Sequence, residues 1–277
     1  IDDICIVGAP KTIDNDLVET DHCPGFGSAA KYIAATFSEI ACDCNVYALP
    51  SITIVEVMGR DAGWLTAASA LGRLNGSGAP DLIYLCERPF DVDQFLTDVR
   101  EKMAEKHSII IAVSEGLRNE EGDYVTNTLK DRAVDAFGHK ILAGASRFLE
   151  EILRQEIGCK VRSIELNVMQ RCASHLASAA DIHEARLIGM AAADYAISGG
   201  SGKMACLQRV STNPYRFTVD FVDITKIANR VKTVPEEWIN EAGNDVTQEM
   251  IDYLLPLIQG EMPCTYKNGV PVHLRLY

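Results

Sequence analysis

The chain has 277 residues, enough for one large domain or two smaller ones with a substantial hydrophobic core. Hydrophobic residues make up 47% and charged residues 23%, which excludes a disordered or fibrous protein. The 26 Lys and Arg against 39 Asp and Glu give a net charge of −13, which argues against a protein that binds nucleic acid or an anionic membrane.

Apolar, β-branched runs alternate with segments of helical periodicity. Strands are predicted at residues 4–7, 52–57, 82–86, 109–113 and 161–168. Amphipathic helices are predicted at residues 29–40, 64–74, 92–103 and 136–157. Strands that alternate with helices are typical of parallel sheets covered on both faces, so we expect an α/β protein with doubly wound architecture.

The last third of the chain continues this alternation. A helix is expected at 181–197 and a strand at 204–208, with the glycine-rich segment 199–202 as the helix end and turn between them. A final helix is expected at 246–258, where Thr247 and Glu249 stand in the first turn.

The cysteines and the lengths of the apolar runs indicate where in the cell the protein is located. The nine cysteines are odd in number and scattered, which predicts reduced thiols in a cytoplasmic protein. No apolar run approaches the roughly 18 residues that a membrane-spanning helix needs, so no membrane association is expected.

Three polar loops follow predicted strands, and ligands of open α/β sheets bind where loops leave the carboxyl ends of strands. These loops span residues 8–16, 58–63 and 114–116. They offer two aspartates, a lysine, an arginine and a glutamate. We therefore predict a ligand site where these loops meet.

The first loop contains Lys11, Asp14 and Asp16. Two nearby aspartates can divide the work between a general base and a ligand of a divalent cation, and a lysine beside them favours phosphoryl oxygens. A turn with solvated charges explains these three residues equally well when they are taken alone. Three polar loops at equivalent strand ends favour a site.

The other two loops also allow two interpretations. Arg60 after Gly59 can hold an anionic or hydroxylated ligand with its guanidinium, or it can be a solvated residue of a strand-to-helix turn. Glu115 can accept hydrogen bonds from a polyol, or it can simply cap its loop. Arg162 and Arg171 are not specific when each is taken by itself.

In chain order, Pro-Lys-Thr-Ile-Asp-Asn-Asp at 10–16, Met-Gly-Arg at 58–60, Ser-Glu-Gly at 114–116 and Met-Gln-Arg at 169–171 resemble the signature segments of the 6-phosphofructokinase family. The resemblance covers nearly the whole chain. It implies two doubly wound, Rossmann-like parallel-sheet lobes. It also implies phosphoryl transfer to the 1-hydroxyl of fructose 6-phosphate, the glycolytic step that gives fructose 1,6-bisphosphate, in a Mg²⁺-dependent homo-oligomer, a dimer or a tetramer.

The resemblance also implies the division of the chain into lobes. Residues 1–26 and 170–225 would belong to the lobe that binds the phosphoryl donor. Residues 27–169 and 226–277 would form the lobe that binds fructose 6-phosphate.

By the same resemblance, Asp14 is the general base that takes the proton of the sugar 1-hydroxyl. Asp16 orients this base or helps to hold Mg²⁺, while Thr12 and Ile13 line the transferring phosphoryl group. Lys11 stabilises the donor.

The sugar phosphate is assigned to the remaining segments. Arg60 faces the developing charge, Glu115 holds sugar hydroxyls, Arg171 binds the 6-phosphate, and Arg162 reaches the 6-phosphate of a neighbouring subunit's site. The whole expected substrate-binding set is Thr12, Ile13, Asp14, Met58, Gly59, Arg60, Glu115, Arg162, Val168, Met169, Gln170 and Arg171.

The donor is expected to be pyrophosphate, because Lys11 stands where pyrophosphate-dependent members carry lysine and bacterial ATP-dependent members carry glycine. ATP is the alternative, since some ATP-dependent members keep this lysine. The chain begins at Ile1, close to the first motif, so we expect that the upstream donor loop with the main Mg²⁺ ligand is missing and that the chain is a fragment. A non-catalytic, sugar-phosphate-binding regulatory subunit is the other alternative.

Overall fold

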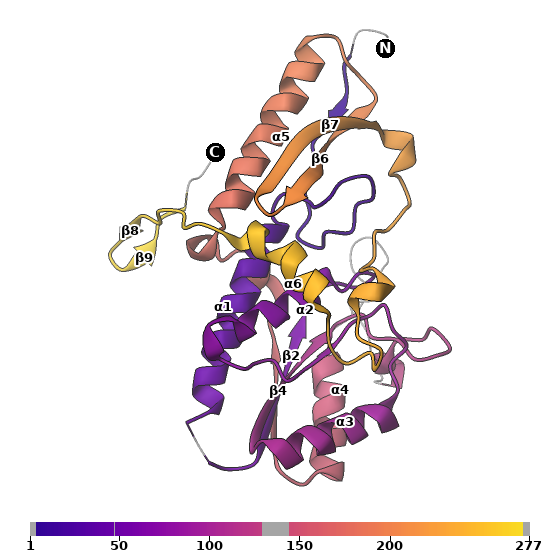
Figure 1. Cartoon of the computed structure of the whole chain (residues 1–277), viewed down its shortest axis with the longest axis vertical. Coiled ribbons are helices and arrows are strands. Elements are labelled where there is room, and N and C mark those ends of the chain that lie inside the picture. Colours follow the sequence, from indigo (N-terminus) through magenta and orange to yellow (C-terminus); the bar gives the residue numbers. More distant parts are fainter. Residues whose placement is uncertain (1–3, 47, 129–143, 274–277) are drawn as a thin grey trace.

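A computed structural model of the chain describes residues 4–46, 48–128 and 144–273. It contains a larger and a smaller sheet, with helices packed against both (Figure 1). The larger sheet has the strand order β3-β4-β2-β5, and the smaller one has the order β1-β6-β7. This α/β architecture confirms the predicted fold class.

The larger sheet is entirely parallel. Its strands are β2 (Ser51–Val57), β3 (Leu82–Tyr84), β4 (Ser108–Ser114) and β5 (Lys160–Glu165). Both central strands are β-branched runs that are buried after their first residue, as expected for strands covered on both faces.

Alternate residues of the central strand β2 enter two separate cores. Val55 and Val57 pack in the core that contains α1 (Phe26–Cys44) and α2 (Trp64–Ala68). Ile52 and Ile54 pack on the opposite face, in the core formed with α3 and α4. The helices α3 and α4 span Val92–Glu105 and Ala145–Glu156. Helix α4 corresponds to the helix predicted at 136–157 from Ala145 onward. Residues 136–143 of that prediction lie outside the described residues.

The smaller sheet is mixed and not purely parallel. β1 (Val7–Gly8) pairs parallel with β6 (Lys203–Thr212), and β6 forms an antiparallel hairpin with β7 (Tyr215–Asp223). Helix α5 (Ala179–Ile197) packs on this sheet. The expected turn at 199–202 is confirmed.

Three strand predictions need correction at their ends. The strand predicted at 4–7 is reduced to β1, because β6 pairs only with Val7 and Gly8, and Ile4 and Ile6 are 60% and 65% exposed. The strand predicted at 82–86 ends at Tyr84. The strand predicted at 161–168 ends at Glu165, because Asn167 adopts a positive φ of 44° and begins the 3₁₀ helix η3 (Asn167–Arg171).

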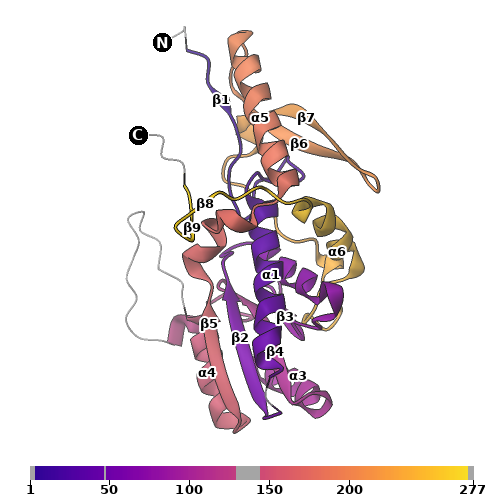
Figure 2. The same ribbon diagram turned by 90° about the vertical axis from the view of Figure 1, so that its left-hand side faces the viewer.

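The chain passes twice between the two sheets. Residues 9–25 connect β1 to α1, which begins beside the first turn of α5 and runs from there along the larger sheet (Figure 2). After β7 the chain returns to pack α6 (Gln248–Leu254) and the 3₁₀ helix η7 (Leu255–Ile258) against α1 and α2, and it ends in the small hairpin β8 (Tyr266–Lys267) and β9 (Val270–Pro271). Across the described ranges, no helix is both long and apolar enough to cross a membrane.

Candidate active site at the carboxyl ends of β2 and β4

The three predicted polar loops meet in one cavity of about 320 Å³. The loop after β1 contributes two aspartates, the loop after β2 contributes an arginine, and the loop after β4 contributes a glutamate. The cavity is lined by Asp14, Asp16, Met58, Arg60, Asp61, Ala62 and Glu115. The structure therefore brings together the base, the arginine and the glutamate that the resemblance assigns to one site.

Hydrogen bonds and one close contact connect the loops after β2 and β4. The Ser114 hydroxyl donates to the carbonyl of Gly59 at 2.6 Å, and the Glu115 amide donates to the carbonyl of Val57 at 3.0 Å. At Gly116 an added Cβ would lie 2.0 Å from the carbonyl oxygen of Arg60, so only glycine fits there. This contact fixes the backbone from which the Arg60 side chain extends.

Glu115 lies in a largely buried position. Its Oε1 accepts a hydrogen bond from the Gly59 amide at 3.3 Å. Burial raises the pKa of Glu115 to about 7, and the nearby carboxylates of Glu56 and Asp14 act in the same direction. The carboxyl group therefore changes charge near neutral pH, and its ionised form is the stronger acceptor for a sugar hydroxyl.

We expect the Glu115→Gln variant to be more stable than the wild type at pH 8 by about 1–3 kcal/mol, because the buried charge is removed. The pKa of Glu115 is about 7 in the folded chain and near 4.5 when unfolded. Protonation of Glu115 thus adds stability that is fully present below about pH 4.5 and is lost as the pH rises through 7. Urea unfolding at pH 5 and pH 8 measures the difference.

The matched control is Glu101→Gln, on the exposed side of α3. It should leave the free energy of unfolding unchanged at both pH values. The elevated pKa of Glu115 would be contradicted if the free energies of unfolding of Glu115→Gln and the wild type differed by the same amount at pH 5 and pH 8.

Asp14 is surrounded by charges of both signs. Burial and the Asp16 carboxylate raise the pKa of Asp14, while Lys11, Arg171 and Arg60 oppose this effect. The Asp14 amide donates to the Thr12 hydroxyl at 3.1 Å, so the side chain of Thr12 supports the local turn. A carboxyl with an elevated pKa at a cavity wall suits a general base, and three cations in its field suit an anionic substrate.

Arg60 keeps part of its guanidinium free. Its Nε is buried and has no hydrogen-bond partner among the residues described. The neighbouring Asp61 carboxylate is paired with Arg118 at 2.8 Å, which leaves Arg60 available to an anion in the cavity.

A second cavity, of about 540 Å³, lies between the first loop, the start of α1 and α5. Of the expected site residues, Lys11, Ile13, Gln170 and Arg171 line it. The buried Gln170 side chain also connects two loops, because Oε1 accepts from the Met58 amide at 3.3 Å and Nε2 donates to the Asn167 carbonyl at 3.1 Å. The expected set is thus divided between two cavities that share the loop 11–16.

Five expected residues line neither cavity. Thr12 and Gly59 instead support the loops, because the Thr12 hydroxyl accepts from the Asp14 amide and the Gly59 amide donates to Glu115. Val168 and Met169 are 48% and 57% exposed on η3. Arg162 lies on β5 opposite Thr53, near the amino end of β2, and pairs with Asp43 at 3.0 Å. Its assignment to a neighbouring subunit's site stays a prediction.

Asn15 is a residue of the site that the sequence motif alone did not single out. It stands between Asp14 and Asp16, it is 0% exposed, and its φ is 57°. Its Nδ2 donates to the Tyr253 hydroxyl at 3.0 Å, and its Oδ1 accepts from the Cys23 amide at 3.0 Å. Asparagine tolerates the left-handed conformation better than most residues, which is a signal for this position.

The carboxylates of the first cavity are suitable ligands for a divalent cation, though they do not make a complete site. Mg²⁺ takes oxygen ligands, and it is usually held by one or two carboxylates together with substrate phosphates. Asp16 can supply one such carboxylate. In the part of the chain that the structure describes, no group of three or more His, Cys, Asp or Glu side chains is placed to hold a metal ion.

Comparisons with known proteins agree with this geometry. The pyrophosphate–fructose 6-phosphate 1-phosphotransferase of Xanthomonas campestris pv. campestris is 40% identical over 273 residues, which is 98% of this chain and 65% of the relative. The enzyme of the same name from Halomonas elongata is 38% identical over 267 residues, which is 96% of this chain and 63% of the relative. This chain thus spans slightly less than two thirds of these relatives.

Solved structures give the same result. The crystal structure of the pyrophosphate-dependent phosphofructokinase from Marinobacter aquaeolei matches with a TM-score of 0.85 and 32% identity, over 99% of this chain and 67% of the other. The family model described as phosphofructokinase matches residues 1–196. The chain therefore belongs to the phosphofructokinase family.

Proposed function

We propose that the protein transfers a phosphoryl group from pyrophosphate to the 1-hydroxyl of fructose 6-phosphate, giving fructose 1,6-bisphosphate and orthophosphate. The observation that carries this proposal is the position of Asp14, which lies in one cavity with Arg60 and Glu115 and in the field of Lys11 and Arg171. The names of the relatives, which are 40% and 38% identical to this chain over the matched residues, support the same reaction.

In this reaction Asp14 accepts the proton of the 1-hydroxyl while the hydroxyl oxygen attacks a phosphorus atom of pyrophosphate. A new O–P bond forms, the bridging P–O bond breaks, and orthophosphate leaves with the electron pair. Arg60 and Lys11 stabilise the negative charge of the transferring group, and Glu115 accepts hydrogen bonds from the sugar. Arg171 binds the 6-phosphate.

We further propose that Asp16 binds Mg²⁺ together with phosphate oxygens of the donor. When bound, Mg²⁺ supplies positive charge to the phosphoryl oxygens. Asp16 lines the same cavity as Asp14, so its carboxylate is on the side of the loop where the base acts.

Three further expectations are carried as proposals. A homo-oligomer would explain why Arg162 lies far from the cavity that its own chain forms. A cytoplasmic location is consistent with nine free cysteines. The lobe boundaries after residues 26, 169 and 225 are proposed as well, and the presence of a smaller and a larger sheet supports a division into two lobes.

The test is an assay with the product of the complete gene, fructose 6-phosphate, Mg²⁺ and either pyrophosphate or ATP. Fructose 1,6-bisphosphate is measured through aldolase and the oxidation of NADH. Turnover with pyrophosphate is expected. Turnover with ATP alone would overturn the donor, and binding of fructose 6-phosphate without turnover would favour a regulatory subunit.

The Lys11→Gly variant tests the donor at one residue. We expect kcat/KM with pyrophosphate to fall about 10–100-fold, because a charge-assisted contact to a compact anion is lost. Any activity with ATP should change less. The exposed Lys267→Gly on β8 is the control, and equal losses with both donors would remove the basis for choosing pyrophosphate.

A further inference from the structure

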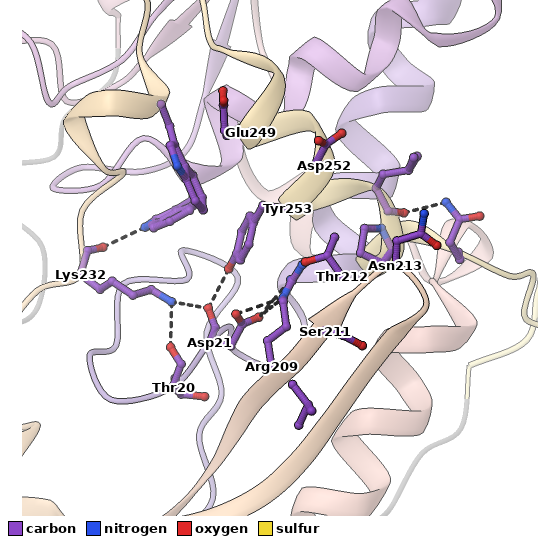
Figure 3. Close-up of a pocket in the computed structure, with 16 residues that line it drawn as sticks. Thr20, Asp21, Arg209, Ser211, Thr212, Asn213, Lys232, Glu249, Asp252 and Tyr253 are labelled. Atoms are coloured by element: carbon purple, nitrogen blue, oxygen red, sulfur yellow. Dashed lines mark hydrogen bonds and ion pairs between the residues drawn. The ribbon is translucent and has the colours of Figure 1, made fainter.

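A lysine remote in sequence binds the loop that carries the two aspartates. Lys232 lies in the segment that returns from the smaller sheet to the larger one, before the 3₁₀ helix η6 (Glu236–Trp238). Its Nζ donates to the carbonyls of Asp21 at 2.7 Å and Thr20 at 3.1 Å, and to Oδ1 of Asn15 at 3.3 Å. Figure 3 shows the ammonium between the two carbonyls. Its three N–H donors are all used.

The main chain of Lys232 makes two further bonds to the site and its surroundings. Its amide donates to the carbonyl of Asp16 at 2.7 Å. Its carbonyl accepts from the indole Nε1 of Trp64 on α2 at 2.8 Å. Lys232 thus contacts both ends of the segment 15–21 and connects this segment to the larger sheet's helices.

Asn15 transmits this contact to the aspartates. Its Oδ1 accepts from Lys232 and from the Cys23 amide, while its Nδ2 donates to the hydroxyl of Tyr253. That hydroxyl donates in turn to the Asp21 carbonyl at 2.7 Å. Both polar atoms of this buried amide therefore have partners. These bonds fix the backbone of Asn15, from which the chain continues directly to Asp14 and Asp16.

We propose that Lys232 is a positioning residue for phosphoryl transfer: through Asn15 it holds Asp14 and Asp16 in the directions that the reaction needs. This inference rests on the proposed function. It gives Lys232 no contact with the substrate, so it predicts an effect on kcat and little effect on the KM of fructose 6-phosphate.

The charge of Lys232 is not consumed by the carboxylate of the same segment. Asp21 is paired with Arg209 at 3.0 Å and with His22 at 2.8 Å. The three N–H donors of Lys232 therefore serve the two carbonyls and Asn15.

The experiment compares Lys232→Met and Lys232→Arg with the wild-type product of the complete gene, with pyrophosphate and Mg²⁺. For Lys232→Met we expect kcat to fall about 10–100-fold, since small misplacements of reacting groups cost this much, with the KM of fructose 6-phosphate changed less than about threefold. Lys232→Arg keeps a cation with several N–H donors at this position, so it should restore part of kcat.

Two further variants make the outcome decisive. Lys226→Met, at an exposed lysine on the same segment, should leave kcat unchanged. Tyr253→Phe removes only the hydroxyl that accepts from Asn15. It should lower kcat severalfold, and it provides the test if Lys232→Met fails to fold. Wild-type kcat in both Lys232→Met and Tyr253→Phe, or a KM of fructose 6-phosphate that rises as much as kcat falls, would overturn the inference alone. Absence of turnover in the wild type would overturn the proposed function and this inference together.

Discussion

Replacement of Asp14 by asparagine is expected to lower kcat by about 10²–10⁴-fold, the usual contribution of a general base. The amide keeps the shape of the side chain, and the bond from the residue's own backbone amide to Thr12 is unaffected. The dissociation constant of fructose 6-phosphate should stay within about threefold, because the proposed role of Asp14 involves only the reacting hydroxyl. Steady-state kinetics and isothermal titration calorimetry measure the two quantities.

The pH profile gives a further check on Asp14. Its pKa is raised above the ordinary value, so the wild-type kcat should decrease on the acidic side as the carboxylate is protonated. The asparagine variant should lack this limb. Asp93→Asn, in the exposed first turn of α3, is the control. If Asp14→Asn weakens sugar phosphate binding as much as it lowers kcat, Asp14 is not the base.

Replacement of Arg60 by methionine is expected to lower kcat/KM by about 10²–10³-fold, as found when a preorganised electrostatic donor is removed from an active site. Arg60 has a buried Nε that no other described group satisfies, so its interaction with an anion in the cavity is not weakened by a competing protein carboxylate. Methionine keeps most of the side-chain volume and removes the charge.

Lysine at position 60 should restore only part of the activity, because an ammonium cannot make the paired contacts of a guanidinium. Arg100→Met, at an exposed ion pair with Glu156, is the control and should behave as the wild type. Full activity in Arg60→Lys would show that the charge alone is needed. Full activity in Arg60→Met would remove Arg60 from the mechanism.

The larger sheet and its loops could be predicted because their signals are local. β2 and β4 are rich in β-branched residues, and the loops that follow them carry the candidate site residues within a few residues of the strand end. The strand β7 was missed, although Tyr215, Phe217 and Val219 alternate with polar residues, which is the period of a half-buried strand.

The contacts of Lys232 could not be predicted from the sequence. It stands 217 residues from Asn15, and its neighbours read as an ordinary solvated segment. Only the return of the chain from the smaller sheet to the larger one brings its ammonium under the loop. The sequence also did not show that Lys11 and Arg171 line a different cavity from Arg60, because this depends on how distant loops pack together.

The residues proposed to react are divided between the two sheets, so their alignment depends on how the sheets are placed relative to each other. Asp14 follows a strand of the smaller sheet, whereas Arg60 and Glu115 follow strands of the larger one. A rotation of one sheet against the other therefore separates the base from the arginine without unfolding either. A substrate that contacts residues of both sheets binds more tightly when the two sheets are aligned. The ratio of its affinities for the aligned and the rotated arrangement sets how far binding shifts the protein toward alignment.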